Sequence, residues 1–170
     1  MMRRKDREVT DEAKIDSIIE RSHCCRLGFY DGGEVYIVPL SFGYVKRDGK
    51  RFFYFHSASE GRKISLLPCN VGIELDCGYE LRTGNSPCDC TAAFSSVIGT
   101  GSAEIVTDPQ EKLLGLQSLM EHTAGQENCQ FRPEVLNAVC VFRVEVCRLS
   151  CKENADQIKF APFKRGNSRC

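Results

Sequence analysis

The sequence predicts a mainly β protein, a closed or nearly closed antiparallel barrel with α-helices packed on its outside. Six or so stretches rich in aromatic and β-branched residues follow one another, and most of them are separated by short turns. Only two stretches have the apolar spacing of a substantial helix. No regular alternation of strand and helix is visible, which argues against a doubly wound nucleotide-binding sheet.

The first expected element is a helix over Asp11–Arg21. Thr10 stands where an N-terminal cap is needed, and acidic residues in the first turn favour the positive end of the helix dipole. The apolar stripe consists of Ile15, Ile18 and Ile19. This spacing predicts that the helix buries one face.

A meander of three strands is expected next. The Asp31-Gly32 and Asp48-Gly49 pairs mark hairpin turns, because such turns need residues that tolerate a positive φ. Pro39 has no N–H to donate, so we expect the second strand to bulge or to lie at a sheet edge there. The strands are expected at Cys24–Tyr30, Glu34–Val45 and Arg51–Ser57.

The second half of the chain begins with a short helix over Gly61–Leu67, which ends at Pro68. Gly99 and Gly101 lie inside a long β-rich stretch, where they permit bending or the close approach of another backbone. The remaining strands are expected at Val71–Cys77, Ala92–Thr107 and Cys140–Asn154.

The second substantial helix begins behind Asp108 and Pro109 and ends before Gly125. Its apolar residues form a stripe that is expected to pack on the sheet, so we interpret them as core and not as cofactor contacts. They are Leu113, Leu114, Leu116, Leu119 and Met120.

Length and composition fit a single domain over residues 1–170, which is long enough to bury a core without disulfide or metal staples. Lys plus Arg equal Asp plus Glu at 23 each, so no overall positive field favours nucleic acid or an anionic membrane. No signal peptide or membrane-spanning stretch is recognised. We therefore expect a soluble, cytoplasmic protein with a basic, loosely ordered tail from about Gln157.

The eleven cysteines form no C-x-x-C pair and have an odd total. Cys140 and Cys147 stand in what reads as a buried strand, where a thiol acts as a small apolar group. The best metal candidate, Cys88–Cys90, would need two more ligands, and His23 and His122 show no suitable spacing. We therefore expect no metal site, and free thiols of the kind a reducing cytosol maintains.

The stretch Phe52–Leu67 carries the clearest functional signal, because an aromatic strand runs into a small polar loop and then a basic helix start. Unpaired N–H groups at a helix N-terminus, together with the side chains of Arg62 and Lys63, suit a bound phosphate. The alternative is an ordinary solvated helix start. His56, at the strand end, has two readings as well: a satisfied histidine or a proton-transfer group.

Four segments also carry a family resemblance. They are MRRKDREVTD at Met2–Asp11, VPLSFGY at Val38–Tyr44, FYFHSASEGRK at Phe53–Lys63 and SVIGTGSAEIV at Ser96–Val106. In this order they resemble the flavin-binding split-barrel proteins related to pyridoxamine 5′-phosphate oxidase, and within them the nitroimidazole-resistance (nitroimidazole reductase-like) branch. The likeness extends to Leu149–Asn154, and the second and third segments together are its specific part. It implies an antiparallel split β-barrel with flanking helices.

The resemblance also implies where a flavin would lie. Pro39, Leu40 and Ser41 would contact the edge of the flavin ring, and Arg62 and Lys63 would hold its phosphate. His56 is the catalytic candidate, because its imidazole can donate or accept a proton near neutral pH. The implied cofactor-binding residues are Pro39, Leu40, Ser41, His56, Ser57, Ala58, Arg62, Lys63, Ser96 and Val97.

As activity, the resemblance implies a flavin-dependent reductase of small oxidised substrates, such as nitroaromatics, with an electron donor that no motif identifies. Flavin mononucleotide (FMN) is the default cofactor and flavin adenine dinucleotide (FAD) the alternative. Family members are usually homodimers with flavin sites at the interface. Two other readings stay open: a non-catalytic flavin or haem carrier, and a structural or regulatory barrel with an empty site. The chain departs from the family in having Cys151, where a glycine is often found, and no Trp.

Overall fold

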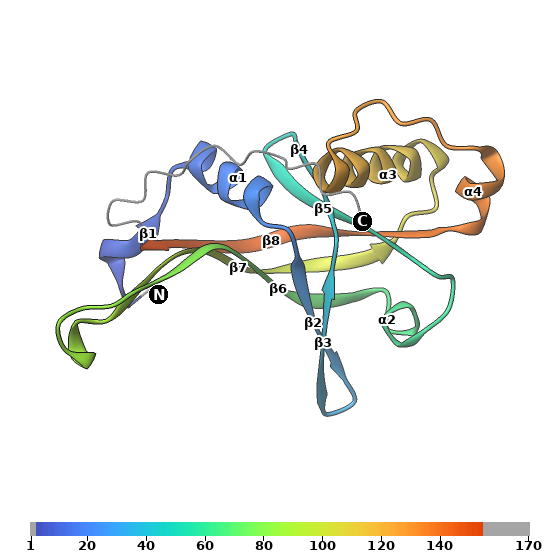
Figure 1. Ribbon diagram of the computed structural model, residues 1–170. Coiled ribbons are helices and arrows are strands. Elements are labelled where there is room, and N and C mark those ends of the chain that lie inside the picture. Colours follow the sequence, from blue (N-terminus) through green and yellow to red (C-terminus); the bar gives the residue numbers. More distant parts are fainter. Residues whose placement is uncertain (1–2, 155–170) are drawn as a thin grey trace, which may run out of the picture.

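In the computed structural model, which describes residues 3–154, one antiparallel sheet runs in the order β3-β2-β6-β7-β8-β5-β4, and β1 pairs with β8 (Figure 1). The two end strands, β3 and β4, are consecutive in the chain, so the barrel is split between them. The strands are β1 Glu8–Val9, β2 Cys25–Asp31, β3 Glu34–Leu40, β4 Gly43–Arg47, β5 Lys50–Ser57, β6 Cys69–Arg82, β7 Thr91–Ile105 and β8 Cys140–Asn154. This confirms the predicted split-barrel class.

The helices flank the sheet, with α1 and α3 on the same side in the view of Figure 1. They are α1 Glu12–Arg21, α2 Arg62–Ser65, α3 Pro109–Ala124 and α4 Pro133–Ala138, with short 3-10 turns at Lys5–Arg7 and Pro87–Asp89. The prediction missed α4, whose six residues are too few to show an amphipathic period. The expected cap at Thr10 was wrong by one residue, because Asp11 accepts from the Lys14 N–H at 2.7 Å.

The stretch predicted as one strand over Glu34–Val45 is two strands. β3 pairs with β2 as far as Leu40, and β4 starts at Gly43 against β5, so the chain changes partners across two residues. β3 is the last strand of the sheet, which confirms that Pro39 lies at an edge.

Two predicted backbone features are confirmed. Asp48 and Gly49 form a two-residue hairpin turn with φ of 51° and 73°. A Cβ placed on Gly99 would lie 2.5 Å from the Arg148 carbonyl oxygen, and one on Gly101 would lie 2.6 Å from that of Glu145. β7 and β8 therefore approach each other closely at the register shift after Thr100.

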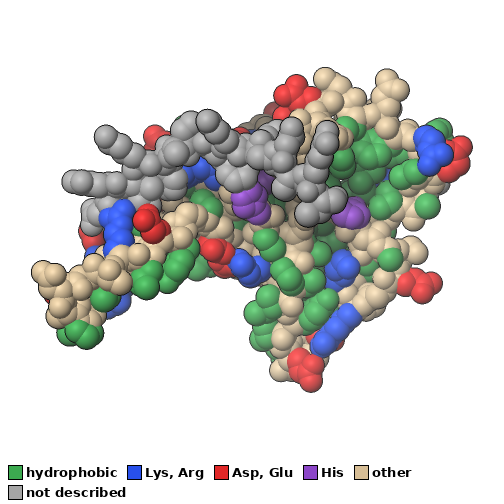
Figure 2. Space-filling view, viewed as in Figure 1, with side chains coloured by type: hydrophobic (Ala, Val, Ile, Leu, Met, Phe, Trp, Pro, Cys, Tyr) green, Lys and Arg blue, Asp and Glu red, His purple; other side chains and the backbone are tan. Residues whose placement is uncertain are grey.

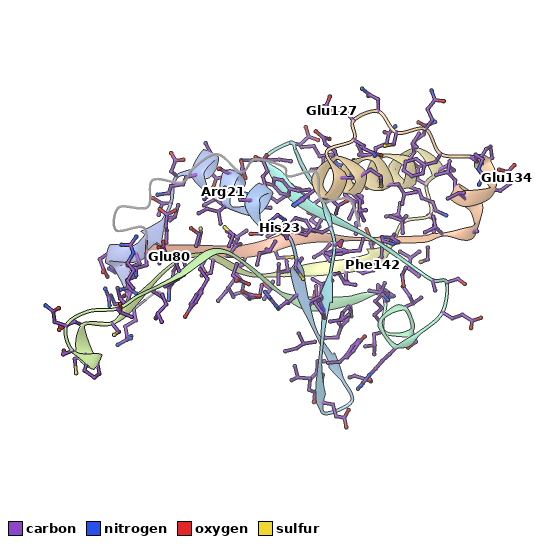
Figure 3. All side chains as sticks on the ribbon, in the orientation of Figure 1. Arg21, His23, Glu80, Glu127, Glu134 and Phe142 are labelled. Atoms are coloured by element: carbon purple, nitrogen blue, oxygen red, sulfur yellow. The ribbon has the colours of Figure 1, made fainter. Side chains whose placement is uncertain are left out.

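The two faces of β5 and β8 belong to different cores. On the inner face, Phe55 and Phe142 stack with ring centroids 4.9 Å apart, in the middle of the molecule where Figure 3 labels Phe142. The three isoleucines of α1 join this inner cluster. On the outer face, Phe52, Tyr54 and Val141 pack under α3 through Leu116. Within residues 3–154, α3 therefore packs on the outer face over β4, β5 and β8, and its main contacts do not extend to β2, β3, β6 or β7, whose outer side is called here the bare outer face.

Glu111 on α3 ties this helix to the outer face. Its carboxylate accepts from Arg47 at 2.8 Å, from the Tyr54 hydroxyl at 2.9 Å and from Arg143 at 2.5 Å. Partial burial acts to raise the pKa of Glu111, but the hydrogen bonds from Tyr54, Arg143 and Arg47 outweigh it and hold the pKa below its ordinary value. Burial and the bond to Glu111 raise the pKa of Tyr54 to about 12.

We expect Glu111→Gln to lower the free energy of unfolding at neutral pH by about 1–3 kcal/mol, because two guanidinium groups lose their shared carboxylate. A lowered pKa stabilises the folded state above the ordinary glutamate pKa, and this contribution disappears as the pH falls through the lowered value. Urea unfolding of both proteins from pH 7 to pH 3 checks this. A difference that stays constant over the whole range would contradict it.

The cysteines are thiols wherever the structure describes them, and residues 3–154 contain no group of three or more potential metal ligands. Cys25 and Cys151 are buried, as expected of core thiols. Cys147 is exposed and Cys140 is only half-buried, so the prediction of a buried strand was wrong for Cys147. In the same residue range, no helix has the length and apolar character needed to cross a membrane. The predicted basic tail lies outside the described residues.

Candidate phosphate cradle at the end of strand β5

The candidate site is built where β5 ends and the chain turns into α2. Ser57, the last residue of β5, is buried at 8% exposure, and no group in the described chain forms a hydrogen bond with its hydroxyl. The sheet register places Cys140 of β8 directly opposite Ser57. Buried hydroxyls nearly always have a partner, so this hydroxyl is available to bond with a ligand.

The loop after Ser57 leads into a single helical turn. Gly61 has a φ of 124°, which favours glycine, and a Cβ there would meet no atom within 4 Å. α2 has four residues, so the helix-dipole part of the sequence argument is weaker than expected. The N–H groups of Arg62 and Lys63 still lack intrahelical acceptors. Anion binding here must therefore rest on these N–H groups and on side chains.

The two basic residues of the cradle differ in their contacts. Arg62 donates from Nε to Asp31 at 2.8 Å and from one amino group to Glu34 at 3.0 Å, and its guanidinium lies 4.8 Å from the centroid of the Tyr36 ring. Lys63 is half-buried and forms no ion pair with the described residues. Lys63 is therefore the cation that is left for a bound anion.

His56 precedes Ser57 and points the other way, because neighbouring side chains of a strand alternate between faces. It lies opposite Val141 on the outer face and is exposed. Ser57, Ala58 and Lys63 therefore belong to one short segment, from the end of β5 to the start of α2, whereas His56 faces the opposite side of β5.

The predicted ring contacts lie at the other end of β3. Pro39 and Ser41 are exposed, and Leu40 is half-buried beside the inner core, opposite Cys25. Pro39 is three residues from Tyr36, about 10 Å along an extended strand. Pro39 and Tyr36 therefore point to opposite sides of β3, whereas Leu40 shares the side of Tyr36 that Arg62 contacts.

Ser96 and Val97 of β7 also alternate between faces. Val97 is fully buried in the inner core between Leu75 and Cys151. Ser96 is half-buried on the outer face, between Asp76 and Lys152. Of the two, only Ser96 presents its side chain on the open outer face.

Sequence reasoning missed the partners of Arg62. Asp31 and Glu34 flank the two-glycine turn of the β2–β3 hairpin, and Tyr36 follows on β3. They lie far from Arg62 in the sequence, and only the folded sheet brings them to α2. Two acidic residues on either side of a turn were the available signal, but they resemble ordinary turn residues.

The bare outer face carries exposed apolar side chains. Figure 2 shows hydrophobic surface along the projecting β6–β7 arm and around the β2–β3 hairpin. Val35 is 72% exposed and Ile37 61%, which is unusual for β-branched residues inside strands. The other members of this apolar face are Tyr30, Tyr79, Leu81 and Ile98.

Comparisons with known proteins agree with this architecture. A family model described as pyridoxamine 5′-phosphate oxidase matches residues 11–155. A crystal structure from Bacteroides thetaiotaomicron, assigned to 5-nitroimidazole antibiotic resistance, is 29% identical with a TM-score of 0.72, and the match covers 86% of each chain. No curated protein is significantly similar in sequence.

Two further solved structures share the fold at lower identity. A flavocytochrome from Azotobacter vinelandii is 20% identical with a TM-score of 0.73, over 90% of this chain and 72% of that one. An FAD- and haem-binding protein from Mycobacterium smegmatis is 15% identical with a TM-score of 0.72, over 86% and 73%.

Proposed function

Because the chain belongs to the pyridoxamine 5′-phosphate oxidase family, we propose that it binds FMN and acts as a flavin-dependent reductase of small oxidised substrates such as 5-nitroimidazoles. The similarity to the 5-nitroimidazole resistance protein supports this substrate class. An external electron donor is required, and FAD is the alternative cofactor.

One observation carries the cofactor proposal: six residues before Lys63, the buried Ser57 hydroxyl has no hydrogen-bond partner within residues 3–154. A phosphate oxygen would accept from this hydroxyl, from the N–H groups at the start of α2 and from the Lys63 ammonium. Such charge-assisted bonds are the strong ones. The residues present therefore fit a phosphorylated cofactor.

When bound, a flavin supplies the electron transfer, and the chain supplies position and protons. Ser57, Ala58 and Lys63 would hold the phosphate end. His56, exposed on the opposite face of β5, would hold or deliver a proton at its imidazole. Because His56 lies on the outer face, it would exchange this proton with a substrate that approaches from solvent or that lies against a neighbouring chain.

We also propose a homodimer in which the bare outer face is covered by a second copy. Exposed apolar side chains on two projecting elements, the β2–β3 hairpin and the β6–β7 arm, flank a charged centre where Arg26 donates to Glu74 at 2.8 Å and also pairs with Asp76. A two-fold rotation can place the positive part of such a mixed-charge centre against the negative part of its copy, inside the apolar rim.

The test is to purify the chain, record its absorbance spectrum and titrate it with FMN. We expect flavin absorbance bands, one flavin per chain, a particle mass of two chains, and a melting temperature raised by about 5–10 °C at a hundredfold excess of FMN over its Kd. Dithionite-reduced protein should then be reoxidised by a 5-nitroimidazole in the absence of oxygen, more slowly in His56→Ala. A colourless protein whose melting temperature does not change when FMN is added would refute flavin binding. A haem absorbance spectrum would instead support the alternative of a non-catalytic haem carrier.

A further inference from the structure

Within residues 3–154, the two strands at the tip of the β2–β3 hairpin pair only with each other. β2 pairs with β6 only from Cys25 to Gly28, and β3 pairs only with β2. Backbone hydrogen bonds of the segment Phe29–Tyr36 therefore stay within the hairpin, which projects away from the sheet in Figure 1. Side chains must hold this tip against the rest of the molecule.

Arg62 makes three contacts to this tip from outside it. Its Nε and one amino group bond to carboxylates on opposite sides of the turn, Asp31 and Glu34, and its guanidinium carbon lies over the ring of Tyr36 in a cation–π contact. Each exposed ion pair alone contributes little. Two bonds and a stacked ring on one rigid guanidinium fix a geometry that a single pair cannot.

We propose that Arg62 is a positioning residue that couples the hairpin tip to the phosphate cradle, an inference that rests on the proposed function. Arg62 adjoins Lys63, and its second amino group, Nη1, bonds to no residue of the described chain. The same guanidinium can therefore face a phosphate while its other donors hold the hairpin. A phosphate that orders Arg62 then stabilises the docked hairpin, and by linkage the docked hairpin tightens phosphate binding.

Hydrogen exchange of the full chain, with and without FMN, tests the coupling. In the wild type, FMN should slow amide exchange in the segment Phe29–Tyr36. In the double variant Asp31→Asn, Glu34→Gln this segment should exchange several-fold faster without FMN, and FMN should protect it less. FMN affinity in the double variant should fall about threefold to tenfold. Arg62→Lys keeps the positive charge but loses the forked guanidinium and its contact with the Tyr36 ring. Its hairpin exchange and its FMN affinity should lie between those of the wild type and the double variant.

Lys50→Gln is the matched control, since it removes an exposed ion pair to Glu145, with an N–O distance of 2.6 Å, at the far end of β5. It should change neither exchange in the hairpin nor FMN affinity. Unchanged exchange in the double variant, or FMN affinity that stays equal or becomes tighter, overturns the coupling. A wild type that takes up no flavin overturns both this inference and the proposed function, whereas a flavin-binding wild type with an unresponsive hairpin overturns the coupling alone.

Discussion

Replacing Lys63 with Ala is expected to weaken FMN binding about tenfold to a hundredfold, the loss of one charge-assisted contact to phosphate. Lys63 is half-buried, lies six residues after Ser57 and has no ion-pair partner in residues 3–154, so its removal takes away the uncommitted cation of the cradle. Quenching of flavin fluorescence on binding measures the affinity.

Two variants sharpen this result. Lys63→Arg keeps a phosphate donor and should retain most of the affinity. Lys50→Ala deletes an exposed lysine that pairs with Glu145 on the neighbouring strand, and it should bind FMN like the wild type. Equal affinities for Lys63→Ala and Lys50→Ala would remove Lys63 from the site.

Gly43→Ala is expected to lower the free energy of unfolding by about 2–4 kcal/mol, with a fall in melting temperature of about 5–12 °C. A Cβ on Gly43 would lie 2.5 Å from the backbone N of Leu119 and 2.7 Å from the carbonyl carbon of Ser118, and it would also meet the Ser118 hydroxyl. Backbone atoms cannot move aside as a side chain can, so β4 and α3 must separate. Thermal and urea unfolding measure the loss.

Gly28→Ala is the matched comparison, because a Cβ at this strand position meets no atom within 4 Å. It should stay within about 0.5 kcal/mol of the wild type, as surface substitutions usually do. If both variants unfold alike, the close approach of α3 to β4 does not limit stability.

Local chemistry made much of the fold predictable. The turn at Asp48 and Gly49, the close approach at Gly99 and Gly101, and the limits of α3 all depend on residues adjacent in sequence. The division of one apolar stretch into β3 and β4 was not predictable in this way, since it depends on which distant strand each half pairs with.

The candidate site likewise has a part that local sequence could predict and a part that depends on distant contacts. The cradle at Ser57 and Lys63 is contiguous in sequence, so its location followed from residue types and the family resemblance. The separation of His56 from Ser57 follows from the two-residue period of a strand, and stricter use of that period would have predicted it. The carboxylates that hold Arg62 come from the β2–β3 hairpin, about thirty residues earlier in the chain. Such a contact is set by sheet topology, which local patterns do not specify.

The proline in β3 bears on how the protein avoids fibrillar growth. β3 is an unpaired edge that carries the exposed Val35 and Ile37, and such an edge can template the addition of a further strand from another molecule. Pro39 interrupts the row of donors that an added strand would need, and Glu34 at the start of β3 repels its counterpart in an identical strand docked in register. These two features disfavour open-ended growth through the edge of β3, in the hydrogen-bonding direction perpendicular to the strands.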